Sequence, residues 1–226
     1  MYKDSTSLVI VTYPSWSGGK FLINCLGLSD QCYFQSAQLA ERQRSNKFNP
    51  IDKLNLLLYR ISLVTNEWDD LKLGCTSLFG INKWYPHDYH TLLKKLAVED
   101  KLFFVVAHNE KHFKELIKIW TRATIIFFKG SHNFIRWRLG DELFARPTDF
   151  GLYKTEPDYP HHYKKLINID TNVIYWDADW YLDKDLFLTH LQDLYKQFNL
   201  TDYNQDLIEQ YYDNYMSKLN QMKDKK

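Results

Sequence analysis

The chain has 226 residues, of which 45% are hydrophobic, enough for one domain with a complete hydrophobic core. The 29 Lys and Arg residues against 28 Asp and Glu give a formal net charge of +1, which excludes a general electrostatic attraction to nucleic acid or to an anionic membrane surface. Any anion must therefore be held by a local site. We expect a single domain over residues 1–226.

The cysteines and the N-terminal residues indicate the compartment. Cys25, Cys32 and Cys75 form no CxxC pair and are odd in number, which is typical of a reduced intracellular chain and gives no reason to expect zinc. The first apolar run stops at Pro14 without a small-residue cleavage site. No stretch approaches the roughly 20 apolar residues of a membrane span. We therefore expect a cytoplasmic protein with no membrane and no nucleic-acid partner.

The first elements in chain order are a strand, a glycine turn and a helix. Residues 8–12 are a short apolar run rich in β-branched side chains, as in a buried strand. Residues 20–28 place apolar side chains at helical spacing. A second helix opens at Pro50, where the missing N–H of proline costs nothing, and continues to about Val64.

Strands and helices then alternate along the rest of the chain. Further strands are predicted at residues 102–107, 124–128 and 172–176. Further helices are predicted at residues 87–98, after Asn109 as N-cap, and at 134–138, 187–198 and 207–222. This alternation predicts an α/β fold with a central, mainly parallel sheet that helices flank on both faces. Residues 140–168 have no clear period and several prolines, as in a lid or binding loop.

The turn Ser17-Gly18-Gly19-Lys20 predicts an anion cradle. Such a cradle needs inward-pointing N–H groups, glycine where a Cβ would obstruct, and the positive end of a helix. Against the nucleotide template GxxxxGK[ST], Gly19 and Lys20 match, while Pro14 replaces the first glycine. Phe21 replaces the hydroxyl that would bind Mg²⁺. The turn therefore predicts an anion site for which no metal is expected.

The same turn carries a family resemblance. The stretch TYPSWSGGKFL, residues 12–22, resembles the loop of the sulfotransferase family, which commonly reads like TYPKSGTTW. The matching positions are Thr12, Tyr13, Pro14, Ser17, Gly18, Phe21 and Leu22. The resemblance implies a P-loop NTPase-like three-layer fold. It also implies transfer of a sulfuryl group from 3′-phosphoadenosine 5′-phosphosulfate (PAPS) to a hydroxyl or amine.

The resemblance continues along the chain in order. His108 follows an apolar strand, as the family's catalytic histidine does, and Lys129 stands where its 3′-phosphate motif has arginine. Asn133 stands at the acidic position of that motif and Trp137 at its serine position. A serine replaces the loop lysine, so that the chain resembles a divergent member. The run from residue 172 through Asp177 into a helix is similar to the family's third element.

The resemblance and the residue chemistry together assign roles. Lys20 is expected to hold the sulfate and phosphate and to support departure of the nucleotide, and His108 to act as general base near neutral pH. The residues expected to bind PAPS are Ser15, Trp16, Ser17, Gly18, Gly19, Lys20, Phe21, Lys129, Ser131 and Arg136.

Two other functions remain open from the sequence. A magnesium-dependent nucleotide kinase or NTPase would use Asp177, which ends an apolar strand, as its metal-binding acid. A non-catalytic nucleotide-binding protein on the same fold would explain the altered motifs. For a transferase, we expect a small-molecule, carbohydrate or lipid acceptor whose pocket involves residues 31–84 and 140–168.

Overall fold

The computed structural model describes residues 8–13, 17–32, 49–62, 101–107, 110–119, 123–129, 133–140 and 171–223. These residues belong to two compact units. The first unit contains every described strand and ends at Tyr181. The second unit begins at Lys20 and resumes at Leu182.

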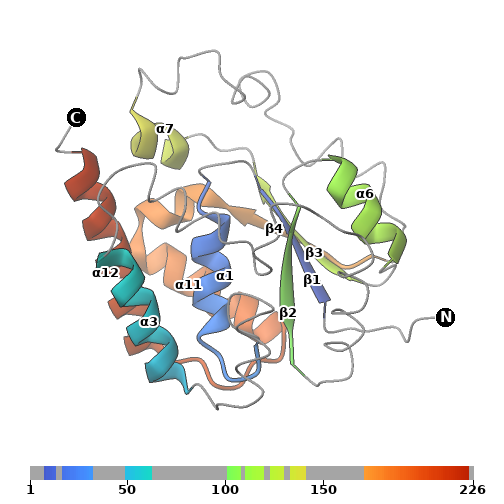
Figure 1. The fold of residues 1–226 in the computed structure, drawn as a ribbon, viewed down its shortest axis with the longest axis horizontal. Coiled ribbons are helices and arrows are strands. Elements are labelled where there is room, and N and C mark those ends of the chain that lie inside the picture. The colour runs from blue at the N-terminus through green and yellow to red at the C-terminus, as the bar shows by residue number, and fades with distance from the viewer. Residues whose placement is uncertain are drawn as a thin grey trace. The chain divides into compact units, whose positions relative to one another are not determined.

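The first unit is built on a parallel sheet (Figure 1). Among the described residues the strands are β1 (Leu8–Thr12), β2 (Phe103–Ala107), β3 (Thr124–Lys129) and β4 (Val173–Asp177). Their order is β2-β1-β3-β4, and each neighbouring pair is parallel. The strand predictions and the parallel α/β class are thus confirmed for the described residues.

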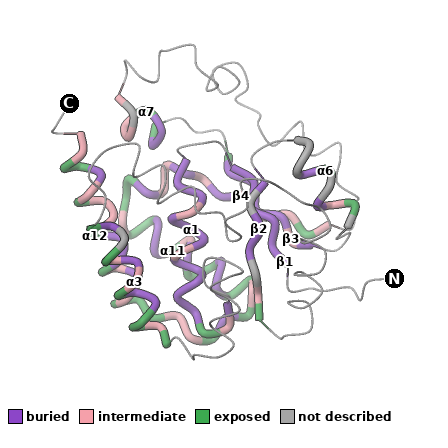
Figure 2. The backbone as a smooth tube through the Cα atoms, viewed as in Figure 1, coloured by how far each residue is buried: buried purple, intermediate pink, exposed green. Residues whose placement is uncertain are grey.

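Strand β1 occupies the centre of the sheet. All five of its residues are buried (Figure 2), because it has a hydrogen-bonded neighbour on each side and its first four side chains are apolar. The chain goes from β1 to β2 on one side and later reaches β3 on the other. The order therefore reverses at β1 and β3, and in open α/β sheets ligands bind beyond the carboxyl ends of the strands at such a point.

Helical segments of the first unit follow the strands. Helix α6 (Glu110–Ile119) buries Phe113 and Leu116, and the Phe113 ring lies 5.7 Å from that of Phe127 in β3. Helix α7 (Asn133–Leu139) follows β3, as predicted. The 3₁₀ helix η1 (Ala178–Leu182) follows β4, and it was not predicted.

The second unit is a group of helices. It contains α1 (Gly19–Gly27) from Lys20 onward, α3 (Pro50–Ser62), α11 (Lys184–Gln197) and α12 (Gln205–Lys223). All four correspond to predicted helices. Asp183 is the N-cap of α11. Its carboxylate accepts a hydrogen bond from the Leu186 N–H, 3.0 Å away.

Aromatic side chains form the core of this unit. The ring of Phe21 in α1 lies within 6.1 Å, centroid to centroid, of four rings from α11 and α12. These four are Phe187, Tyr211, Tyr212 and Tyr215. Burial of several large rings against one another makes Phe21 a main anchor of α1.

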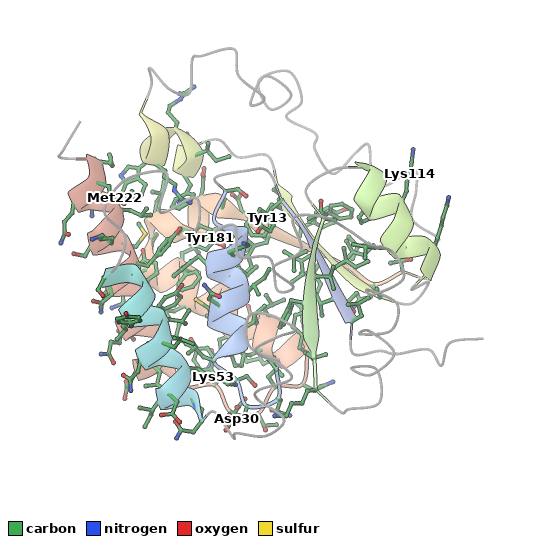
Figure 3. All side chains as sticks on the ribbon, viewed as in Figure 1. Tyr13, Asp30, Lys53, Lys114, Tyr181 and Met222 are labelled. Atoms are coloured by element: carbon green, nitrogen blue, oxygen red, sulfur yellow. The ribbon has the colours of Figure 1, made fainter. Side chains whose placement is uncertain are left out.

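A buried lysine fastens the far end of α1 to α3. Lys53 donates to the carbonyl oxygen of Ser29, and its Nζ lies 3.6 Å from Asp30 (Figure 3). Asp202 accepts a 2.6 Å hydrogen bond from the Ser29 hydroxyl and another from the Asp30 N–H. The turn after α1 is thereby tied to α3 and to the segment between α11 and α12.

Some predicted features fall on other parts of the chain. The predicted helix at residues 87–98, the N-cap at Asn109 and, apart from Gly140, the irregular segment at 140–168 lie outside the described residues.

Candidate functional site

The glycine turn leads directly from β1 towards a helix. Gly18 has φ +78°, a left-handed conformation that L side chains rarely adopt, and α1 begins at Gly19. Ser17 is buried. Lys20 is the second residue of α1 and is half-buried. The first four N–H groups of a helix have no partner within the helix itself, and in α1 they begin at Gly19.

Aromatic rings of the protein pack closely on both glycines. A Cβ on Gly18 would lie 2.6 Å from Cε2 of Tyr181 and 3.3 Å from the ring of Phe134. A Cβ on Gly19 would overlap the ring of Tyr13. The sequence predicted that a side chain here would obstruct an anion. The structure gives these glycines a packing role that involves no ligand.

Two tyrosines connect the turn to the sheet edge (Figure 3). The ring of Tyr13 lies 5.4 Å from that of Phe128 in β3, so that the residue after β1 contacts the neighbouring strand. The hydroxyl of Tyr181 donates a 3.1 Å hydrogen bond to the carbonyl oxygen of Gly18. The Tyr181 ring also makes an edge contact with Phe134, 4.9 Å between centroids. The turn is therefore held between β1, β3 and η1.

Lys129 ends β3 at the same edge of the sheet. It is exposed, and its backbone is in register with Asp177 of β4. Its Nζ lies 5.8 Å from the ring centroid of Tyr175, within reach of a cation–π interaction. Arg136, on α7, is also exposed. Both cations belong to the unit that contains Gly18.

A carboxylate of the protein occupies the start of α7. Asp179 accepts a 2.8 Å hydrogen bond from the Phe134 N–H and a 2.6 Å hydrogen bond from the Asn133 side-chain amide. The Asp179 N–H in turn donates to Asp177, 3.0 Å away. A carboxylate at a helix N-terminus is favoured by the helix dipole. The first donors of α7 thus serve Asp179.

The predicted site residues are distributed as follows. Ser17, Gly18 and Gly19 form the turn; Lys129 ends β3 and Arg136 lies on α7, within the same unit. Phe21 turns its side chain into the aromatic core of the second unit, so that its ring is not available to a ligand. The predicted residues outside the described parts are Ser15, Trp16, His108 and Ser131.

Sequence reasoning missed Asp179 and Tyr181. Both lie in η1, and the contacts that give them a role reach far along the chain, to Asn133 and Gly18. An acidic residue three positions after a predicted strand is a weak signal for a helix cap elsewhere, and nothing in the local pattern points Tyr181 at the turn.

Within the described ranges, no helix has both the length and the apolar character needed to cross a bilayer. No cluster of three or more His, Cys, Asp or Glu side chains suited to a metal ion occurs in those ranges either. Comparison of the chain with protein-family models, with curated proteins and with solved structures found no match.

Proposed function

We propose that the protein is a metal-independent transferase of the sulfotransferase type, which takes a sulfuryl group from PAPS. The observation that carries the proposal is the path of the chain after β1, where the strand order of the sheet reverses. There, β1 leads through Gly18, at φ +78°, into α1 at Gly19, with Lys20 in the first turn. A strand, glycine turn and helix N-terminus in this arrangement suit a phosphate or sulfate group.

The proposed roles follow from the charges that the reaction develops. The N–H groups at the start of α1 and Lys20 hold the phosphosulfate end of the donor, and Lys129 and Arg136 attract its 3′-phosphate. His108 takes the proton of the acceptor hydroxyl or amine as that group attacks sulfur. The bond between sulfur and the bridging phosphate oxygen breaks, and 3′-phosphoadenosine 5′-phosphate leaves. Fixed positive groups near this oxygen supply most of the rate enhancement in such transfers.

Phe21 distinguishes this proposal from a magnesium-dependent kinase. A kinase loop would place a metal-binding hydroxyl at this position, whereas Phe21 is 2% exposed and surrounded by rings of α11 and α12. A hydroxyl there would have to replace a core side chain. The position therefore favours a donor that binds without a metal.

The testing experiment is calorimetric titration of 3′-phosphoadenosine 5′-phosphate in the presence of EDTA. We expect binding by the wild-type chain and at least about tenfold weaker binding by Lys20→Ala, since a charged contact is worth roughly 1.5–3 kcal/mol. Lys118→Ala is the matched control, because Lys118 is an exposed lysine in the last turn of α6. Tighter binding of ATP in a parallel titration with Mg²⁺ and without EDTA, or no binding of 3′-phosphoadenosine 5′-phosphate at all, would contradict the proposal.

A second measurement separates an enzyme from a binding protein. Once a donor is bound, transfer of labelled sulfuryl groups to a panel of phenols, sugars and lipids is followed in the wild type and in His108→Ala. Binding without transfer to any acceptor would leave a nucleotide-binding protein on this fold.

A further inference from the structure

We infer that Tyr181 is a positioning residue that sets the direction of the Gly19 N–H at the anion site. The inference rests on the proposed function, since it assigns a role in holding the donor. Its evidence is the hydrogen bond from the Tyr181 hydroxyl to the Gly18 carbonyl, which lies entirely in the first unit.

The geometry of the peptide bond makes the step from carbonyl to N–H. A trans peptide is planar, and its C=O and N–H point in opposite directions. No cis peptide occurs among the described residues, so the Gly18–Gly19 bond is trans. When the Tyr181 hydroxyl holds the Gly18 oxygen, the Gly19 N–H must point to the opposite side of the turn. Gly19 is the first residue of α1, and the first N–H groups of a helix have no partner within the helix itself.

A Gly-Gly peptide needs such a restraint more than others do. Glycine adopts left- and right-handed conformations with similar ease, so the Gly18–Gly19 peptide can rotate at little cost. A peptide that rotates would present a carbonyl oxygen to an anion in place of an N–H. If the peptide is already held in the free protein, anion binding does not lose the conformational entropy of ordering it.

The Tyr181 hydroxyl is itself held firmly. Its ring has no exposed surface and contacts Phe134 and Trp176, with centroids 4.9 Å and 6.0 Å away. Phe134 is in turn fixed through its N–H by Asp179. Through Tyr181, the glycine turn is therefore held against η1 and α7.

The test compares two tyrosine-to-phenylalanine substitutions, each of which removes one buried hydroxyl. Tyr181→Phe removes the hydroxyl at the turn and keeps the ring. Tyr195→Phe is the matched control, because Tyr195 is also buried and its hydroxyl donates a 2.9 Å hydrogen bond to a backbone carbonyl, that of Cys25 in the second unit. Inorganic pyrophosphate and 3′-phosphoadenosine 5′-phosphate are titrated into each variant with EDTA present, and the thermal midpoint is recorded.

We expect both variants to lose a similar amount of thermal stability, and only Tyr181→Phe to bind both anions about five- to tenfold more weakly, the worth of one hydrogen bond. Equal affinity in Tyr181→Phe and Tyr195→Phe would overturn the inference and leave the proposed function standing. Pyrophosphate binding that depends on Tyr181, without preference for the nucleotide, would support the inference and remove PAPS as donor. Failure of the wild type to bind either anion would overturn both.

A measurement on the wild type covers the case in which Tyr181→Phe does not fold. In protein labelled with ¹⁵N-glycine, the amide of Gly19 should show a larger shift on pyrophosphate addition than that of Gly18 or Gly27. A Gly19 amide that does not move while pyrophosphate binds would overturn the inference.

Discussion

The ring of Phe21 stacks on that of Tyr215 with centroids 4.3 Å apart and an interplanar angle of 15°. The contact joins the first turn of α1 to α12 within the second unit. One helix therefore presents its N-terminal backbone at the glycine turn and buries its third residue in an aromatic core. The side chain at position 21 therefore contributes to the stability of the aromatic core.

Replacing Phe21 with threonine should restore the hydroxyl of a magnesium-binding loop and damage the fold. Loss of a large buried aromatic ring costs roughly 3–5 kcal/mol in the free energy of unfolding. We expect this loss in urea denaturation, with no gain of Mg²⁺-dependent ATP binding. The control is Tyr59→Ala, an aromatic residue of α3 that is 61% exposed and whose removal should change stability by less than about 0.5 kcal/mol. Gain of ATP binding with unchanged stability would show that the ring is dispensable.

Gly18 and Gly140, the two glycines with positive φ among the described residues, allow backbone strain and side-chain crowding to be measured separately. Gly140→Ala adds a Cβ in open space at φ +76°, so it should cost only the left-handed strain of about 1–2 kcal/mol. Gly18→Ala adds the same strain at φ +78° and places its Cβ against Tyr181, so that overpacking adds a further 1–3 kcal/mol or so. Equal effects of the two substitutions on the free energy of unfolding would mean that the Tyr181 ring can move aside.

Asp179 should stabilise the start of α7 as a helix cap. Asp179→Ala removes the acceptor of the Phe134 N–H and of the Asn133 amide, and loss of a cap typically costs about 0.5–2 kcal/mol. The matched control, Asp183→Ala, removes the cap of α11 in the second unit and should cost a similar amount. Only Asp179→Ala should also change affinity for 3′-phosphoadenosine 5′-phosphate, because it alters both the charge and the packing beside the turn. Identical binding by the two variants would place α7 outside the donor site.

The second unit should lose stability in alkaline solution. Burial raises the pKa of Tyr203 to about 12 and that of Tyr212 to about 12, against about 10 in the unfolded chain. Between pH 10 and 12 the unfolded chain binds fewer protons than the folded protein, so the free energy of unfolding falls as pH rises through this window. Below pH 10 the contribution is fully present. Tyr212→Phe should make the fall less steep.

Phenolate absorbance near 295 nm checks this pH dependence directly. In the folded protein part of the signal should appear only above pH 11, whereas in urea all tyrosines should titrate near pH 10. Complete titration near pH 10 without unfolding would contradict the burial of these two hydroxyls.

The sequence was sufficient for elements whose signal is local. The buried strand at residues 8–12 and the helix begun by Pro50 carry their signal in neighbouring side chains, and both lie where predicted. The 3₁₀ helix η1 could not be predicted, because its residues owe their placement to partners far along the chain: Tyr181 to Gly18, and Asp179 to Phe134. Gly18 was predicted as a special turn position, but the rings that require glycine there come from distant segments.

The central place of β1 has a consequence for how the protein is made. Residues 8–12 leave the ribosome before their two neighbouring strands, which start at Phe103 and Thr124. Until both arrive, β1 exposes apolar side chains and two unpaired edges, the kind of segment that aggregates or recruits chaperones. Tyr181, which restrains Gly18, is synthesised later still. The glycine turn is thus synthesised well before the side chain that holds it, and it reaches its final conformation only after Tyr181 has been made.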